Sequence, residues 1–168
     1  MNERHLIVDQ IAFAREYTLW LLDTIDKAQW FHRPDGCVTH VAWQVGHLAS
    51  AQYRLALLRI RGERPEDENL ISKAFMKQFG ANSDADPNPD ASSYPPPAEI
   101  RAVLDRVHAQ TLRELRDLDE RSLDQPAERP HPKRKTKREI LYWCAQHEFV
   151  HAGQIGLLRR LMGQKPLW

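Results

Sequence analysis

Residues 141–163, LYWCAQHEFVHAGQIGLLRRLMG, constrain the fold most, because they read as one amphipathic helix with two histidines on its apolar face. His147 and His151 are four residues apart, about one helical turn, so both imidazoles project from the same side. Apolar residues share that side at three- and four-residue steps: Ile140, Trp143, Cys144, Val150, Ile155, Leu158 and Leu161. A buried imidazole without a partner costs about 1–3 kcal/mol. The two histidines therefore need hydrogen-bond partners or a metal ion.

Three other long segments and one short segment also have helical periodicity, and together they predict an all-α fold. Long helices are expected over residues 2–26, 40–61 and 97–119, with a short helix over 68–78. The last long helix is expected to begin at the capping box formed by Thr136 and Glu139 and to end near Gly163. The prediction is a four-helix bundle with long connections between helices 2 and 3 and between helices 3 and 4. With 168 residues, the chain is expected to form a single domain, residues 1–168.

The first helix has two apolar stripes, which predicts packing on two sides. One stripe contains Ile7 and Ile11, and the other contains Leu6, Phe13 and Trp20. Such a helix lies centrally in a bundle or turns one face to a partner subunit. We expect a homodimer, with Trp168 as a possible anchor for the dimer or the core.

Composition excludes several classes of function. The net charge of +1 provides no field for nucleic acid or an anionic membrane surface, and we expect neither partner. No apolar run of about 18 residues predicts a membrane span, and residues 1–10 do not resemble a signal peptide. Cys37 and Cys144 form no paired motif, and Cys144 is expected to be a small buried hydrophobe. A cytoplasmic location is the expectation.

The second predicted helix contains a third histidine within an apolar stripe. His47 follows Trp43 by one turn, and small residues, Gly46 among them, surround it, which would allow another chain segment or a ligand to approach closely. If the second and fourth helices are neighbours, His47, His147 and His151 form a three-nitrogen site. Three protein ligands leave a coordination position open, and imidazoles suit zinc, nickel, iron or copper. The alternative is that these are core histidines with hydrogen-bond partners only.

The remaining histidines are expected at the surface rather than at a metal. They are His5, His32, His40, His108 and His131. Trp43, Gln44 and Gln154 are the candidates for contacts around the three inner histidines, with core packing or helix-face hydrogen bonding as their alternative roles.

Two motifs together resemble the DinB-like superfamily of metalloenzymes (DinB/YfiT). They are W-x-x-G-H-L-A at residues 43–49 and H-E-x-x-H-x-G-Q-I at residues 147–155, and the order of four long helices is similar over essentially the whole chain. The resemblance implies a divalent metal, zinc or nickel first and iron next, held by His47, His147 and His151.

The resemblance also implies a class of chemistry, because characterised relatives include thiol-dependent transferases and isomerases. We expect a transferase that acts with a low-molecular-weight thiol, whose thiolate a metal would stabilise. Arg159, Arg160, Lys165 or residues of the 80–97 loop are the candidates to bind the carboxylates of such a thiol.

Two other classes of function stay open at this point. A metal-dependent hydrolase needs a base beside a metal-bound water. His147, Glu148 and His151 do satisfy H-E-x-x-H, but no strand is predicted, which argues against a metalloprotease. Glu148 is instead expected to contact a ligand histidine or to be a surface charge. A non-catalytic, dimeric metal-binding protein is the last alternative, and a fourth protein ligand that closed the site would favour it.

Overall fold

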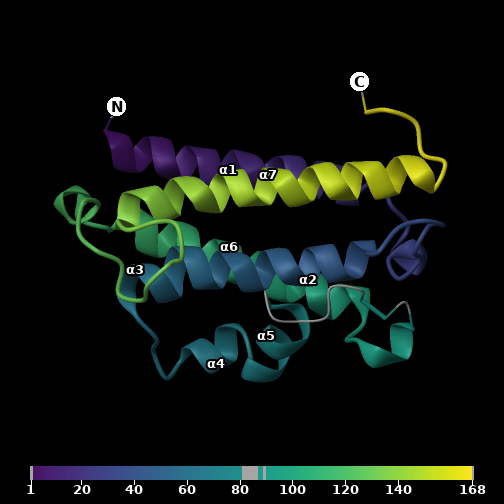
Figure 1. The fold of residues 1–168 in the computed structure, drawn as a ribbon, viewed down its shortest axis with the longest axis horizontal. Helices are drawn as coiled ribbons and strands as arrows, with labels where there is room; N and C mark the ends of the chain where they lie inside the picture. Colours follow the sequence, from purple (N-terminus) through teal and green to yellow (C-terminus); the bar gives the residue numbers. More distant parts are fainter. Residues whose placement is uncertain (1, 81–86, 89, 168) are drawn as a thin grey trace.

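The computed structural model describes residues 2–80, 87–88 and 90–167, and this part of the chain is helical without strands (Figure 1). Its helices are α1 (Glu3–Leu22), α2 (Val41–Gln52), α3 (Arg59–Arg61), α4 (Asp67–Leu70), α5 (Lys73–Phe79), α6 (Pro97–Arg116) and α7 (Lys137–Leu161). A π-helical segment, Tyr53–Leu58, joins α2 to α3. Three short 3₁₀ turns cover Lys27–Gln29, Ala91–Ser93 and Glu120–Ser122. Trp168 lies outside the described residues, as does most of the 80–90 segment.

The long helices form the predicted four-helix bundle. Helix α1 packs against α7 and α6, and α2 packs against α6 and α7, so each long helix has two neighbours (Figure 1). The predicted contact between the second and fourth helices is therefore confirmed. Contact between α2 and α7 is what can bring His47 toward His147 and His151.

Helix boundaries follow local capping signals. The Thr136–Glu139 capping box is present at the start of α7, and Pro97 opens α6 as expected. The predicted helix over 68–78 is instead two helices, because Ile71 is extended and Ser72 caps the first turn of α5. Helix α1 ends at Leu22 with Asp23 as its C-cap, earlier than predicted, and Asp26 caps the following 3₁₀ turn, Lys27–Gln29.

The second long helix has the predicted extent but not the predicted geometry. It runs without a break from Val41 to Arg61 and ends at Gly62, which has a positive φ of 83°. Residues 53–58 within it form a π-helix. A π turn bonds residue i to residue i+5, which changes the faces on which later side chains appear.

Gly46 permits a close contact between α2 and α5. A Cβ atom at Gly46 would lie 2.3 Å from a ring carbon of Phe79, whose side chain is fully buried. The close approach expected at this glycine is therefore real, and the group that approaches is an aromatic side chain. This contact places α5 directly beside the turn of α2 that carries His47.

The second apolar stripe of α1 is exposed. Phe13 is 61% accessible and Leu6 is 43% accessible, and on the adjacent helix α7 Val150 and Leu157 are 53% and 59% accessible. Phe13 contacts Phe149 of α7, with ring centroids 6.0 Å apart. The alternative of a central first helix, packed on both faces within the chain, is wrong. An apolar face formed by α1 and α7 remains on the surface.

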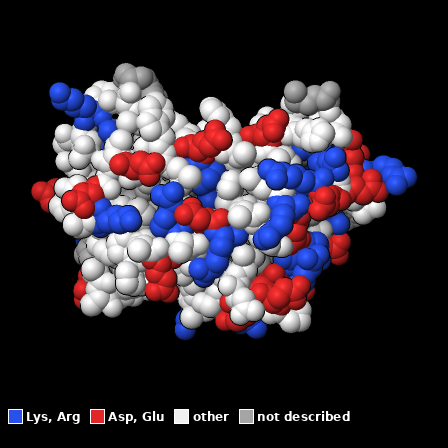
Figure 2. Space-filling model, turned by 180° about the vertical axis from the view of Figure 1, so that it is seen from behind, with Lys and Arg blue, Asp and Glu red and all other residues white. Residues whose placement is uncertain are grey.

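Charged side chains of both signs are mixed over the face in Figure 2. Lysine and arginine alternate there with aspartate and glutamate, and neither sign covers the face. Within the described residues, no helix is both long and apolar enough to cross a bilayer.

Candidate metal centre

Three histidines from two helices meet inside the bundle. His47 of α2 and His147 and His151 of α7 each offer a ring nitrogen, and these nitrogens lie within 4.8 Å of one another. The ring centroids are 4.5 Å apart for His147 and His151, and 4.6 Å apart for His47 and His151. The predicted proximity of these side chains is confirmed. We call this group the histidine cluster.

A backbone carbonyl fixes the tautomer of His47. Its Nδ1 lies 2.9 Å from the carbonyl oxygen of Phe79. A carbonyl oxygen can only accept, so Nδ1 carries the proton and Nε2 keeps its lone pair. The indole ring of Trp43 stacks on a face of the His47 ring, with the two centroids 4.7 Å apart and an angle of 12° between the two planes. The ring is thereby held in one orientation with a free basic nitrogen.

A side-chain relay orients His151 in the same way. Its Nδ1 lies 2.6 Å from Oε1 of Gln44, and Nε2 of Gln44 donates to the hydroxyl of Thr39 at 3.0 Å. In this arrangement Nδ1 of His151 donates its proton to the Gln44 amide oxygen. The contact expected of Gln44 is present, and Gln154 also makes a side-chain hydrogen bond to His151. An outer hydrogen bond that fixes the tautomer and raises ligand basicity is typical of metal-binding histidines.

Burial keeps all three imidazoles neutral. It lowers the pKa of His151 to about 3 and that of His147 to about 4, with further lowering from the neighbouring histidines. It also lowers the pKa of His47, and the charge of Arg54 acts in the same direction. Neutral imidazoles are the form that binds metals.

A pocket of about 320 Å³ opens beside the cluster. His47 and His147 form its inner wall, and Ala51, Arg54, Leu55, Arg59, His131, Pro132 and Trp143 form the rest. Trp143 meets the ring of His147 edge-on at 5.8 Å. The size is typical of a small-molecule site.

Sequence reasoning did not identify the basic residues of this pocket. Arg54 and Arg59 are five residues apart, which places them on different faces of an α-helix but about one turn apart in a π-helix. His131 comes from the connection before α7, and no local motif associates it with the cluster.

Glu148 is neither a surface charge nor a partner of a ligand histidine. Its carboxylate is 3% exposed and accepts from Nε of Arg15 at 2.6 Å and from Nη2 at 3.1 Å. Arg15 also donates to the Leu104 carbonyl and to Oε1 of Gln52. This network joins α1, α2, α6 and α7, and both positions expected for Glu148 are therefore wrong.

The candidates for binding carboxylates lie elsewhere. Arg159 donates to Thr24 and to the carbonyl of Lys165. Arg159 and Arg160 line a separate, smaller hollow with Tyr17 and Leu167. Neither arginine lines the pocket beside the histidine cluster. The prediction that Arg159 or Arg160 binds the carboxylates of a thiol in the pocket beside the cluster is therefore wrong.

Of the histidines expected at the surface, His40 is buried and His108 is partly buried. His40 is fully buried and caps α2, with Nδ1 accepting from the backbone of Trp43. Nδ1 of His108 accepts from Nε2 of Gln52, since Oε1 of that amide already accepts from Arg15. Cys144 is buried as predicted, and burial raises the pKa of its thiol. His40 and Cys144 therefore lie in the interior of the bundle.

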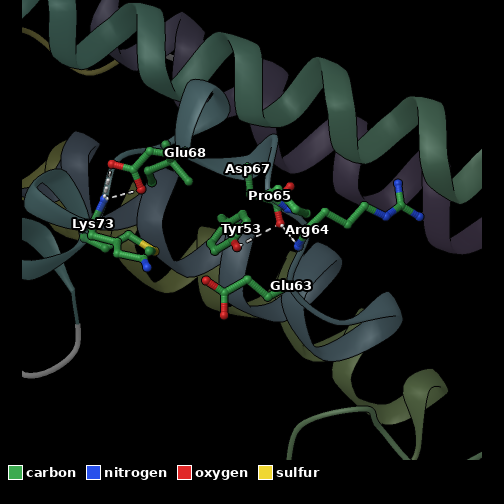
Figure 3. A pocket seen from close by; sticks show the side chains of 9 residues that line it. Tyr53, Glu63, Arg64, Pro65, Asp67, Glu68 and Lys73 are labelled. Carbon is green, nitrogen blue, oxygen red and sulfur yellow. Dashed lines mark hydrogen bonds between the residues drawn. The ribbon is translucent and has the colours of Figure 1, made fainter.

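A larger pocket, about 560 Å³, lies between the end of the second long helix and α4–α5 (Figure 3). Hydrogen bonds engage the carboxylates of Asp67 and Glu68 in its lining. Asp67 accepts from the Tyr53 hydroxyl, from the backbone of Arg64 and from two nitrogens of Arg61. Glu68 accepts from the backbone of Lys73 (Figure 3). Among the described residues, its lining contains no histidine or cysteine, and its buried carboxylate, that of Asp67, is paired with Arg61.

The fold and the cluster together define a helical bundle with an internal histidine triad. The family model of the DinB superfamily matches residues 10–155, and the chain belongs to that superfamily. A crystal structure of a conserved protein from Enterococcus faecalis is similar over 98% of this chain and 99% of that one, with a TM-score of 0.67 and 19% identity. At that identity the likeness supports the fold. No curated protein matches the chain.

Proposed function

We propose that this protein binds one divalent metal ion through His47, His147 and His151. The observation that carries the proposal is the convergence of three neutral imidazoles, two of which donate from Nδ1 to an oxygen acceptor. Within the described residues, the group contains no fourth ligand. Three ligands and an adjoining pocket are typical of a reactive site rather than a structural one. Zinc and nickel are the first candidates and iron the next, because imidazole ligands suit each of them.

We further propose transfer chemistry with a low-molecular-weight thiol as the function. A bound divalent metal would hold a thiol as its thiolate, which is the nucleophilic form. The chain's own residues supply the rest of the site. His47 and His147 face the pocket, and Trp143 forms an apolar wall against which a small molecule can lie.

The surroundings of the cluster favour transfer over hydrolysis. A hydrolase of this kind needs a base next to the attacking water. Over the part of the chain that the structure describes, the pocket lining contains no carboxylate, and Glu148 is engaged by Arg15 in a buried ion pair. A pre-formed thiolate needs no such base.

We also propose a homodimer formed through the exposed face of α1 and α7. Apolar side chains such as Phe13, Val150 and Leu157 lie on it. The two helices pack side by side, so the face is continuous and can pair with a second copy about a two-fold axis.

The test begins with metal content. Elemental analysis of the purified protein should give about one divalent metal per chain, and His147→Ala should abolish it while helix content stays. His5→Ala, an exposed histidine outside the cluster, is the matched control and should keep the metal. Unchanged metal in His147→Ala would refute the site.

The thiol step needs a separate measurement. Cobalt- or nickel-substituted protein is titrated with small thiols while its absorption is recorded. A thiolate charge-transfer band is expected to appear at low thiol concentration. Stoichiometric metal without any spectral response to thiols would refute the transfer proposal and leave the metal site standing.

A further inference from the structure

The pocket beside the histidine cluster is basic. Arg54, Arg59 and His131 line it together with apolar groups, and none of the described residues that line it is acidic. The guanidinium group of Arg134 lies over the indole ring of Trp143, which lines the pocket, at 5.4 Å from the ring centroid. Cationic groups therefore approach this pocket from the second long helix and from the connection before α7.

The π-helical segment creates this arrangement. The backbone N–H of Arg59 bonds to the carbonyl of Arg54, which is an i to i+5 bond. In an α-helix, five residues correspond to about 500°, so the two side chains would diverge by about 140°. The wider π turn brings them to nearly the same face. Two guanidinium groups can then line one cavity.

Arg54 and Arg59 are partly buried, and they differ from the ion-paired arginines Arg15 and Arg61. Arg15 is paired with Glu148, and Arg61 is paired with Asp67 and Glu114. Among the residues that the structure describes, Arg54 and Arg59 form no ion pair. Nε of Arg59 is buried without a hydrogen-bond partner, and its Nη1 only reaches the Arg54 carbonyl at 3.3 Å. A buried donor of this kind is costly unless a ligand or water satisfies it.

Other charges strengthen the positive field. The pKa of His131 is lowered first by burial and then by the charges of Arg59, Arg134, Arg54 and Lys133. A divalent metal at the cluster would add two more positive charges. A neutral substrate would leave this charge uncompensated, whereas an anionic one would neutralise part of it.

We propose that the pocket selects a substrate with an oxyanion group, a carboxylate or a phosphate, which Arg54 and Arg59 bind while the reacting end of the substrate faces His47 and His147. This inference rests on the proposed function, because it names the substrate class of that site. Guanidinium groups present paired N–H donors that match carboxylate and phosphate oxygens. Arg54 and Arg59 are thus specificity residues of the pocket.

The test compares two thiols that differ only in charge. Cobalt-substituted protein is titrated with 3-mercaptopropionate and with its neutral amide, 3-mercaptopropionamide. Because hydrogen bonds to charged groups are the stronger ones, we expect the acid to bind at least about ten-fold more tightly. In R54Q/R59Q, the two affinities should agree within about two-fold, while R54K/R59K should keep a preference for the acid.

The matched control is R160Q, an exposed arginine that does not line this pocket, and it should behave as wild type. Metal content and circular dichroism are measured for every variant, so that loss of the metal or of the fold is not read as loss of anion binding. Equal affinity of wild type for acid and amide would overturn the inference and leave the thiol proposal intact.

A second readout separates the two proposals further. Ligand-observed NMR with propionate, propionamide and inorganic phosphate needs neither a thiol nor a bound metal. Binding of propionate or phosphate that R54Q/R59Q abolishes would support the inference even if no thiolate band forms, and the relative affinities tell carboxylate from phosphate. Absence of any anion preference in this assay would overturn it.

Discussion

Glu148→Gln is expected to destabilise the protein strongly without removing the metal. The side chain keeps its shape, so no cavity forms, but Arg15 loses its counter-charge while only 2% exposed. Arginine cannot release its proton at accessible pH, so the charge stays buried. Removing one partner of a buried ion pair costs about 3–5 kcal/mol. For a domain of this size that corresponds to a fall of about 6–20 °C in Tm.

The assay is urea unfolding followed by circular dichroism, with metal content measured on the same samples. Glu16→Gln is the matched control, because Glu16 follows Arg15 in sequence but is exposed, and its expected effect is within about 0.5 kcal/mol. A loss below about 1 kcal/mol for Glu148→Gln, or a loss of metal with stability intact, would refute the structural role and restore Glu148 as a residue of the metal centre.

A double-mutant cycle with Arg15→Met sharpens the result. If the pair is coupled as its geometry indicates, the double variant should be more stable than the sum of the single losses predicts. It should remain less stable than wild type, because the Leu104 carbonyl and Gln52 also lose a donor. Additive losses would show that the two charges do not interact.

Three further predictions follow from the same structure. Gly46→Ala should cost about 1–3 kcal/mol in urea unfolding despite its better helix propensity, because its Cβ would overlap the buried ring of Phe79; a stabilised variant would contradict the packing. Stability of metal-free protein should fall as pH drops from about 6.5, because unfolded His108 gains a proton there and the folded side chain, with a pKa of about 3, does not, and the histidines of the cluster act in the same direction; His108→Gln should make the pH profile of the unfolding free energy less steep, and an unchanged profile would count against the lowered pKa of His108. Leu157→Glu should yield a monomer in sedimentation, whereas Val38→Glu, an equally exposed residue outside that face, should not; dimer retained in Leu157→Glu would exclude the α1–α7 face.

Periodicity and capping were sufficient to predict the bundle, because the apolar stripes and end signals of the four long helices act locally. The His47, His147 and His151 grouping was also predicted, because each histidine lies within an apolar stripe and the resemblance to the DinB-like superfamily implied the same three residues. Gln44 was predicted for the same reason, one turn before His47.

The basic pocket could not be predicted, because its formation depends on a change of helical period. Nothing in residues 53–58 marks a π turn, and with α-helical geometry Arg54 and Arg59 belong to different faces. The contact between His47 and the Phe79 carbonyl could not be predicted either, since it depends on how closely α5 approaches Gly46. Both features arise from backbone geometry and packing that no side-chain pattern specifies.

Adjacent residues of α7 serve two separate buried sites, and helical geometry explains how. His147 and Glu148 are consecutive, so they project about 100° apart. One side chain faces α2 and the pocket, and the other faces Arg15 of α1. In a zincin, the glutamate of the H-E-x-x-H motif lies beside the metal. In this chain the glutamate of that motif, Glu148, instead pairs with Arg15 of the neighbouring helix α1. The metal proposal thus predicts that His147 variants lose metal and keep stability, and that Glu148 variants do the reverse.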